Sequence, residues 1–265
     1  MRIPKIIACD LDGTVLLNGA RTASPQLLEQ IRRLRERGIL FMVASGRQYA
    51  SERMVFGPAV ADDLVYMSEN GGLCYYNDEI LFQYEFERGL ALEIIDAVLA
   101  QEGCEILISV PGVQYVCPKD PAFYTHMTEV VGGNLQKIRD PHAITEPFIK
   151  LAVFNFSGDT RRAYFEKLLH GRCMLQTSGN AWLDFLQPGL HKGRGMQELL
   201  KRLGIDPEDC MAFGDNENDT EMLQLVGCPI TMETSNPTMI HLGKYRTDTV
   251  EHALERILDG EGYDW

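Results

Sequence analysis

Short apolar runs that end in acidic or small polar residues recur along the chain, and segments with helical periodicity lie between them. Residues 6–9 form the first run and lead into Asp10, while residues 39–44 form another and lead into Ser45. Between them, residues 24–38 begin with Ser-Pro, carry apolar side chains at helical spacing and end in glycine. Continuous apolar runs are typical of strands buried on both faces, so this order predicts a parallel strand–helix–strand unit.

The C-terminal part repeats the same alternation. A further apolar run at 64–67 leads into a Glu-Asn-Gly-Gly turn. The pattern then predicts helices at 192–203, 220–226 and 250–258, and strands at 210–213 and 229–232. Both ends of the chain therefore contribute to one α/β fold, a doubly wound parallel Rossmann-like sheet.

The hydrophobic pattern in the middle of the chain differs from that of the two ends. Its predicted strands are more amphipathic, at 105–110, 114–117, 150–156 and 182–186, with helices near 90–101 and 160–169. Such a pattern favours an α+β insert whose sheet is open to solvent or to a cleft on one side. We therefore expect a core domain of residues 1–81 and 187–265, interrupted by an inserted domain of residues 82–186.

The net charge and the cysteine content narrow the range of possible partners and cellular locations. The chain of 265 residues has a formal net charge of −13, which opposes binding to nucleic acid or anionic membranes. Its seven cysteines form no Cys-x-x-Cys pair, so we expect reduced thiols. The sequence shows neither a signal peptide nor an apolar stretch near the roughly 18 residues of a membrane span, and a soluble cytoplasmic protein is expected. The oligomeric state stays open.

Candidate chemistry begins at the end of the first strand. Asp10 and Asp12 are two residues apart, which on an extended segment places both carboxylates on one side. Gly13 permits a tight turn there. Paired carboxylates can divide the work of nucleophile and acid–base. An Asp-x-Asp-Gly segment can also be a calcium-like or solvated turn.

A second acidic cluster follows the strand at 210–213. Asp215, Asn218 and Asp219 lie in a loop that would repel a substrate phosphate unless a cation joined them. Mg²⁺ suits such a loop because it prefers oxygen ligands and often binds carboxylates and phosphate together. Capping of the next helix is the alternative for this loop, and for Asp219 in particular.

Phosphate-binding candidates lie at two further segment ends. Ser45 and Gly46 offer a hydroxyl and a backbone N–H, and Lys192 offers a positive charge at a helix start. We expect Arg47 to pair with a nearby carboxylate rather than with substrate. His191 is more simply an incidental loop histidine than a base.

Taken together, Asp10-Leu-Asp-Gly-Thr14, Ser45-Gly46-Arg47, Lys192-Gly193 and Gly214-Asp215-x-x-Asn218-Asp219 resemble the four motifs of the haloacid dehalogenase-like superfamily. The long insert resembles that of the Cof-type (subfamily IIB) sugar-phosphate phosphatases. The resemblance spans the whole chain and implies a Mg²⁺-dependent hydrolase acting on a small phosphorylated metabolite, with the insert as a cap. Ser45 stands where threonine is commoner, and residues 233–236 depart from the usual Gly-Asn-Ala.

The resemblance also implies a role for each matching residue. Asp10 would be the nucleophile that forms an aspartyl-phosphate, and Asp12 the general acid and base. Asp10, the Asp12 backbone carbonyl and Asp215 would bind Mg²⁺. Substrate phosphate would contact the Leu11 backbone, Ser45, Gly46, Lys192 and Asn218, with Asp219 in support. Because Asp12 is absent from the dehalogenase branch, a phosphate ester is the implied substrate.

Two other functions remain compatible with these motifs: a phosphosugar mutase of the same superfamily and a non-enzymatic sensor of phosphorylated metabolites. A sensor would require neither Asp10 nor Asp12. Trp182, Tyr115 and Tyr124 of the insert could line a cleft, but aromatic residues in such segments are more often core. The sequence does not specify the substrate.

Overall fold

The computed structural model describes residues 3–177 and 181–264, and the chain divides into two compact units. The first unit comprises Met1–Arg47, Glu52–Phe82 and His191–Trp265, and the second comprises Gln48–Ser51 and Gln83–Leu190. As functional domains, the division at 82 and 186 stays a prediction. No described helix combines the length and apolar character needed to cross a membrane.

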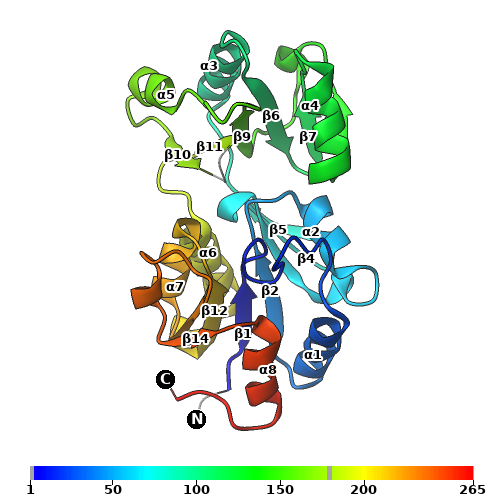
Figure 1. The fold of residues 1–265 in the computed structure, drawn as a ribbon, viewed down its shortest axis with the longest axis vertical. Helices are drawn as coiled ribbons and strands as arrows, with labels where there is room; N and C mark the ends of the chain where they lie inside the picture. Colours follow the sequence, from blue (N-terminus) through cyan, green and yellow to red (C-terminus); the bar gives the residue numbers. More distant parts are fainter. Residues whose placement is uncertain (1–2, 178–180, 265) are drawn as a thin grey trace. The chain divides into compact units, whose positions relative to one another are not determined.

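The first unit contains an eight-stranded sheet (Figure 1). In sheet order the strands are β14 (Tyr245–Thr247), β13 (Cys228–Met232), β12 (Cys210–Gly214), β1 (Ile6–Cys9), β2 (Leu40–Ala44), β3 (Val65–Ser68), β4 (Leu73–Tyr76) and β5 (Glu79–Gln83). Neighbours from β14 to β3 are parallel, which confirms the doubly wound α/β prediction. β4 pairs antiparallel with β3, an extension that the apolar pattern did not predict.

Helices cover both faces of this sheet. α1 (Pro25–Glu36) packs against α8 (Val250–Leu258), and α6 (Lys192–Leu203) packs against α7 (Thr220–Leu225) on the opposite side (Figure 1). α2 (Tyr49–Phe56) connects β2 to β3. Ser24 caps α1 by accepting a hydrogen bond from the Leu27 N–H, as its sequence position predicts. The central strands β1 and β12 are buried along their whole length.

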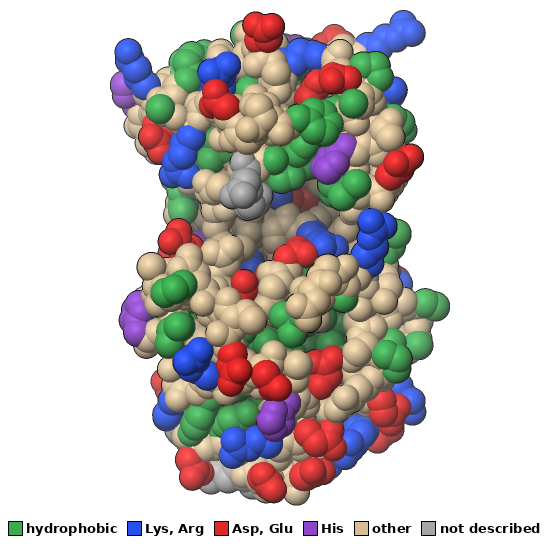
Figure 2. Space-filling model, viewed as in Figure 1, with side chains coloured by type: hydrophobic (Ala, Val, Ile, Leu, Met, Phe, Trp, Pro, Cys, Tyr) green, Lys and Arg blue, Asp and Glu red, His purple; other side chains and the backbone are tan. Residues whose placement is uncertain are grey.

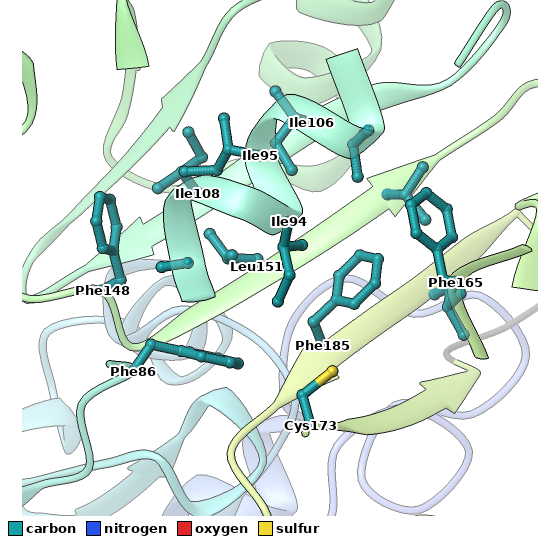
Figure 3. Packing of buried hydrophobic residues seen from close by; sticks show 14 of the residues in the cluster. Phe86, Ile94, Ile95, Ile106, Ile108, Phe148, Leu151, Phe165, Cys173 and Phe185 are labelled. Carbon is teal, nitrogen blue, oxygen red and sulfur yellow. The ribbon is translucent and has the colours of Figure 1, made fainter. Parts of the chain in front are cut away.

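The second unit is an α+β fold with a six-stranded sheet, as predicted for the insert. Its strands in sheet order are β10 (Met174–Thr177), β11 (Trp182–Leu186), β9 (Lys150–Phe154), β6 (Glu105–Val110), β7 (Val113–Val116) and β8 (Leu135–Lys137), and its helices are α3 (Arg88–Leu99), α4 (Pro121–His126) and α5 (Arg162–Leu169). On one face, Ile94 and Ile95 of α3 pack against Ile106 and Leu151 (Figure 3).

The other face of this sheet is not open along its length, contrary to the expectation from amphipathic strands. Phe123 and Met127, in α4 and the turn after it, pack on this face against Phe154. Trp182 and Tyr124 join that cluster, while Tyr115 packs on the α3 side and donates a hydrogen bond from its hydroxyl to Glu146. All three aromatic residues are therefore partly buried and pack against the hydrophobic clusters of this unit.

Candidate active site

The point where the strand order reverses lies between β1 and β12. From β1 the chain proceeds to β2 and β3 on one side, and from β12 it proceeds to β13 and β14 on the other. In such sheets, ligands bind beyond the carboxyl ends of the strands at this point. Asp10 follows β1 and Asp215 follows β12, and the Asp10 N–H donates a 3.1 Å hydrogen bond to the Phe213 carbonyl. Strand pairing therefore brings the two acidic segments together.

A fully buried lysine joins two of the carboxylates. The Lys192 Nζ donates to Asp10 Oδ1 at 2.5 Å and to Asp219 Oδ1 at 2.6 Å. Lys192 is the first residue of α6, and His191 caps that helix by accepting a hydrogen bond at Nδ1 from the Arg194 N–H. A buried ammonium is tolerable when carboxylates pair with it at this distance. This cap gives His191 a structural role. The sequence predicted an incidental loop histidine rather than a catalytic base.

Asp219 also shapes the acidic loop. Its Oδ2 accepts hydrogen bonds from the backbone N–H groups of Asp215 and Asn216, at 3.0 and 3.2 Å. Asn218 lies in the same short turn, Glu217–Asp219. Asp219 therefore takes part in the capping box of this turn and also binds Lys192, whereas its side chain does not cap the next helix, α7, which was the alternative for this residue.

The charges of the cluster are not balanced. Burial raises the pKa of Asp10 well above its usual range, although Lys192 opposes this. Burial also raises the pKa of Asp215, and the charge of Asp219 adds to it. For Lys192, burial would lower the pKa, but Asp10 and Asp219 outweigh it and the pKa rises. Three carboxylates share one ammonium, so a further cation would stabilise their ionised forms.

The donor set fits a divalent cation. One carboxylate oxygen from each of Asp10, Asp215 and Asp219 can be chosen so that all lie within 4.8 Å of one another. Oxygen-only donors of this kind suit Mg²⁺. The Thr14 hydroxyl donates to Asp215 Oδ1 at 2.9 Å. Gly13 has φ +95°, and a Cβ there would lie 2.7 Å from Asp215 Cγ, so glycine allows the two loops to approach.

The side chain of Asp12 lies outside this carboxylate cluster. Arg47 donates from Nε to Asp12 Oδ2 at 2.8 Å and from a terminal nitrogen to Oδ1 at 2.5 Å. The Asp12 side chain is 60% exposed. The expectation that Arg47 pairs with a nearby carboxylate is confirmed, and the partner is the candidate acid. Both oxygens of Asp12 therefore accept a hydrogen bond from the Arg47 guanidinium.

Ser45 and Gly46 lie at the end of β2, next to β1. The Ser45 hydroxyl oxygen accepts a hydrogen bond from the Arg47 N–H at 3.1 Å, which leaves its own proton available to an anion. At the end of β1, the Leu11 carbonyl accepts from the N–H groups of Thr14 and Leu16. The predicted residues thus lie at the ends of neighbouring strands, while their roles toward substrate stay predictions.

Two features of the site were missed in the sequence. Thr14 directly follows the Asp-x-Asp-Gly segment, so its hydroxyl could have been proposed as a partner of the acidic loop. Glu52 and Ser68 form a fully buried hydrogen bond beside the end of β3, with Ser68 Oγ donating to Glu52 Oε2 at 2.5 Å. No local pattern marks Glu52, because its partner belongs to another element.

Comparisons with known proteins place the chain in a family of hydrolases. The haloacid dehalogenase-like hydrolase family matches residues 7–253. The 5-amino-6-(5-phospho-D-ribitylamino)uracil phosphatase YbjI of Escherichia coli is 30% identical over 260 residues, covering 96% of this chain and 94% of that protein. The HMP-PP phosphatase of an Enterobacter species is 27% identical, covering 96% of each chain.

Solved structures show the same fold. A crystal structure from Eubacterium rectale has a TM-score of 0.85 at 26% identity and covers 95% of this chain and 98% of that one. A subclass IIB sugar phosphatase has a TM-score of 0.76 at 18% identity, covering 95% and 98%, and this likeness concerns the fold alone. The prediction of a Cof-type phosphatase is confirmed, and the chain belongs to the haloacid dehalogenase-like hydrolase family.

Proposed function

We propose that this protein is a Mg²⁺-dependent phosphatase that hydrolyses small phosphomonoesters through an aspartyl-phosphate on Asp10. The observation that carries the proposal is the buried pairing of Asp10 with Lys192 beside Asp215, at the switch point of the sheet. A buried nucleophile with a fixed positive partner fits phosphoryl transfer, in which catalysis depends mainly on charge compensation and positioning. Asp10, Asp215 and the Asp12 carbonyl would hold Mg²⁺, which would neutralise negative charge on the phosphoryl oxygens.

In the first step, a carboxylate oxygen of Asp10 attacks phosphorus and the bond from phosphorus to the ester oxygen breaks. Lys192 favours the ionised form of Asp10 against the effect of burial and orients it, since its Nζ donates to Oδ1 at 2.5 Å. Asp12 gives a proton to the departing alkoxide, which leaves as an alcohol. General acid catalysis of this kind contributes about 10²- to 10⁴-fold.

In the second step, Asp12 takes a proton from water, and the resulting hydroxide attacks the phosphorus of the aspartyl-phosphate. The bond from phosphorus to Asp10 breaks, inorganic phosphate leaves and the carboxylate is restored. Ser45, Gly46, Asn218 and the Leu11 backbone would hold the phosphoryl oxygens during both steps. We propose the insert as the part that selects the leaving group.

The substrate is proposed to be a small metabolite with a phosphorylated alcohol, such as a sugar phosphate. The names of the relatives support this class, since YbjI acts on a phosphorylated ribitylaminouracil and the Enterobacter protein on HMP-PP. Acidic and basic side chains are interspersed on the face drawn in Figure 2, in keeping with the net charge of −13. That charge favours a small ligand held by local groups over a polyanionic polymer.

The test is phosphate release from a panel of phosphomonoesters, with and without Mg²⁺, by the wild type and Asp10→Asn. The panel includes 5-amino-6-(5-phospho-D-ribitylamino)uracil and hexose phosphates, and the diphosphate HMP-PP is tested beside it. We expect Mg²⁺-dependent turnover that Asp10→Asn abolishes. Turnover that requires a bisphosphate activator and retains the phosphoryl group would instead indicate a mutase, and binding without any turnover would indicate a sensor.

A further inference from the structure

The turn after β3 is buried beside the candidate phosphate-binding groups. Glu69, Asn70 and Gly71 have φ angles of 53°, 58° and 92°, so three consecutive residues adopt the left-handed region. Side chains other than that of glycine rarely adopt it, although asparagine does so more readily than most. Asn70 is fully buried. A strained turn that is also buried must be held by its surroundings.

The turn is bonded to the loop that carries Ser45. The Asn70 N–H donates to the Ser45 carbonyl at 2.9 Å, and the Glu69 N–H donates to the Arg47 carbonyl at 3.0 Å. The Asn70 side chain also packs on Gly46, since a Cβ at Gly46 would lie 3.0 Å from Asn70 Oδ1 and 3.3 Å from Nδ2. The Asn70 amide group therefore lies directly against the Gly46 backbone.

The same turn contacts the start of α6. A Cβ on Gly71 would lie 2.7 Å from the His191 carbonyl oxygen and 3.4 Å from the Lys192 Cα. A Cβ on Gly195, one turn along α6, would lie 2.8 Å from the Gly71 Cα. The backbone of the turn is thus packed directly on the helix end that carries the buried lysine.

A buried hydrogen bond holds the end of β3, directly before the turn. Ser68, the last residue of β3, donates from its hydroxyl to Glu52 Oε2 at 2.5 Å, and both side chains are fully buried. Burial raises the pKa of Glu52 well above its usual range, so this acid is more readily neutral than an exposed glutamate. The end of β3 is thereby fixed before the turn begins.

We propose that Asn70 is a positioning residue for phosphate binding: its side chain sets the Gly46 backbone, and its turn links the Ser45 loop to the Lys192 helix start. This inference rests on the proposed phosphatase function. Asn70 itself does not need to touch the substrate. It acts by keeping two phosphate-binding segments, which come from different strands and helices, at a fixed separation.

The test uses Asn70→Gly, which keeps a left-handed backbone accessible but removes the side chain from Gly46. Asn77→Gly is the matched control, because Asn77 is also left-handed, with φ 52°, but lies exposed in the turn between β4 and β5. The measurements are kcat, KM, the inhibition constant for inorganic phosphate and the thermal midpoint, all with Mg²⁺. A displacement of about 1 Å at a reacting group can cost roughly 100-fold.

We expect Asn70→Gly to weaken phosphate inhibition and kcat/KM about 10- to 100-fold, while Asn77→Gly matches the wild type. In a Ser45→Ala background the Asn70 change should cost much less, since the loop it positions is already impaired. Wild-type phosphate inhibition in a folded Asn70→Gly, or additive effects with Ser45→Ala, would overturn the inference. Failure of the proposed function would look different, because the wild type itself would then hydrolyse no ester.

Discussion

Replacing Lys192 by methionine tests whether this lysine and a bound cation share the task of neutralising the carboxylate cluster. The side chain of Lys192 is fully buried and bonded to Asp10 and Asp219. Methionine fills a similar volume but leaves both carboxylates without a positive partner. Breaking a buried ion pair by removing one member costs about 3–5 kcal/mol. That corresponds to a lowering of the thermal midpoint of roughly 6–20 °C for a unit of this size.

A matched control is available in the second unit. Lys150 is also buried, and its Nζ lies 3.4 Å from Asp184 Oδ2. This ion pair is a suitable control because neither residue belongs to the acidic loop. Lys150→Met should lower stability as well, but it should leave the response to Mg²⁺ unchanged. Lys192→Met makes the cluster more negative by one charge, so Mg²⁺ should bind at least about tenfold more tightly, given roughly 4 kcal/mol between unit charges 4 Å apart.

The assay is thermal unfolding of the three proteins, wild type and both variants, at pH 7.5 over a range of Mg²⁺ concentrations. The account predicts that both variants unfold at lower temperature without metal and that Mg²⁺ restores stability selectively to Lys192→Met. Equal Mg²⁺ shifts in all three proteins would refute the reasoning, as would a Lys192→Met protein as stable as the wild type. Either result would mean that the charge of Lys192 does not matter to this cluster.

Two further changes test separate parts of the structure. Gly13→Ala should weaken Mg²⁺ binding, because a Cβ at a φ of +95° would clash with the Asp215 side chain. Gly19→Ala is the control and should not weaken it, because Gly19 has φ +76° but open space around it. Titration of thermal stability with Mg²⁺ compares the two variants. Asp96→Asn should lower the pKa of His142, which its hydrogen bond to Asp96 raises above 6.5. The sign means that this pair stabilises the protein below pH 6.5 and that the contribution is lost as the pH rises through the raised pKa. Histidine proton resonances followed by NMR over pH 5–9 measure that pKa, and an unchanged value would contradict the assignment.

The parts of the fold that could be predicted are those marked by a pattern within their own residues, such as a capping residue, a terminal glycine or regular apolar spacing. α6 begins and ends where the sequence predicts, at Lys192 and Leu203, because glycine follows it and apolar residues recur at helical spacing. β4 was missed because Leu73–Tyr76 follows a turn and pairs antiparallel with the preceding strand, so it lacks the isolated apolar run of a central strand. Short segments of this kind are defined by their partners rather than by their own pattern.

The same distinction applies to the site. Motif spacing located Asp10 and Asp215, since strand ends in a parallel sheet converge at one edge, and it placed Lys192 at the start of a helix. The pairing of Arg47 with Asp12 was predicted only as pairing with some carboxylate, because the identity of the partner depends on where the loop after β1 turns. The contacts of Asn70 with Ser45 and Gly46 depend on packing between β3, β2 and α6, which spacing alone cannot reveal.

The most direct test of the central claim is chemical trapping of the covalent intermediate. A radiolabelled phosphomonoester that the enzyme turns over is mixed with it and Mg²⁺, the reaction is quenched with acid within one turnover, and the labelled peptide is sequenced. The account predicts label on the peptide containing Asp10 in the wild type and none in Asp10→Asn. Full-rate phosphate release without protein label, together with turnover by Asp10→Asn, would contradict it.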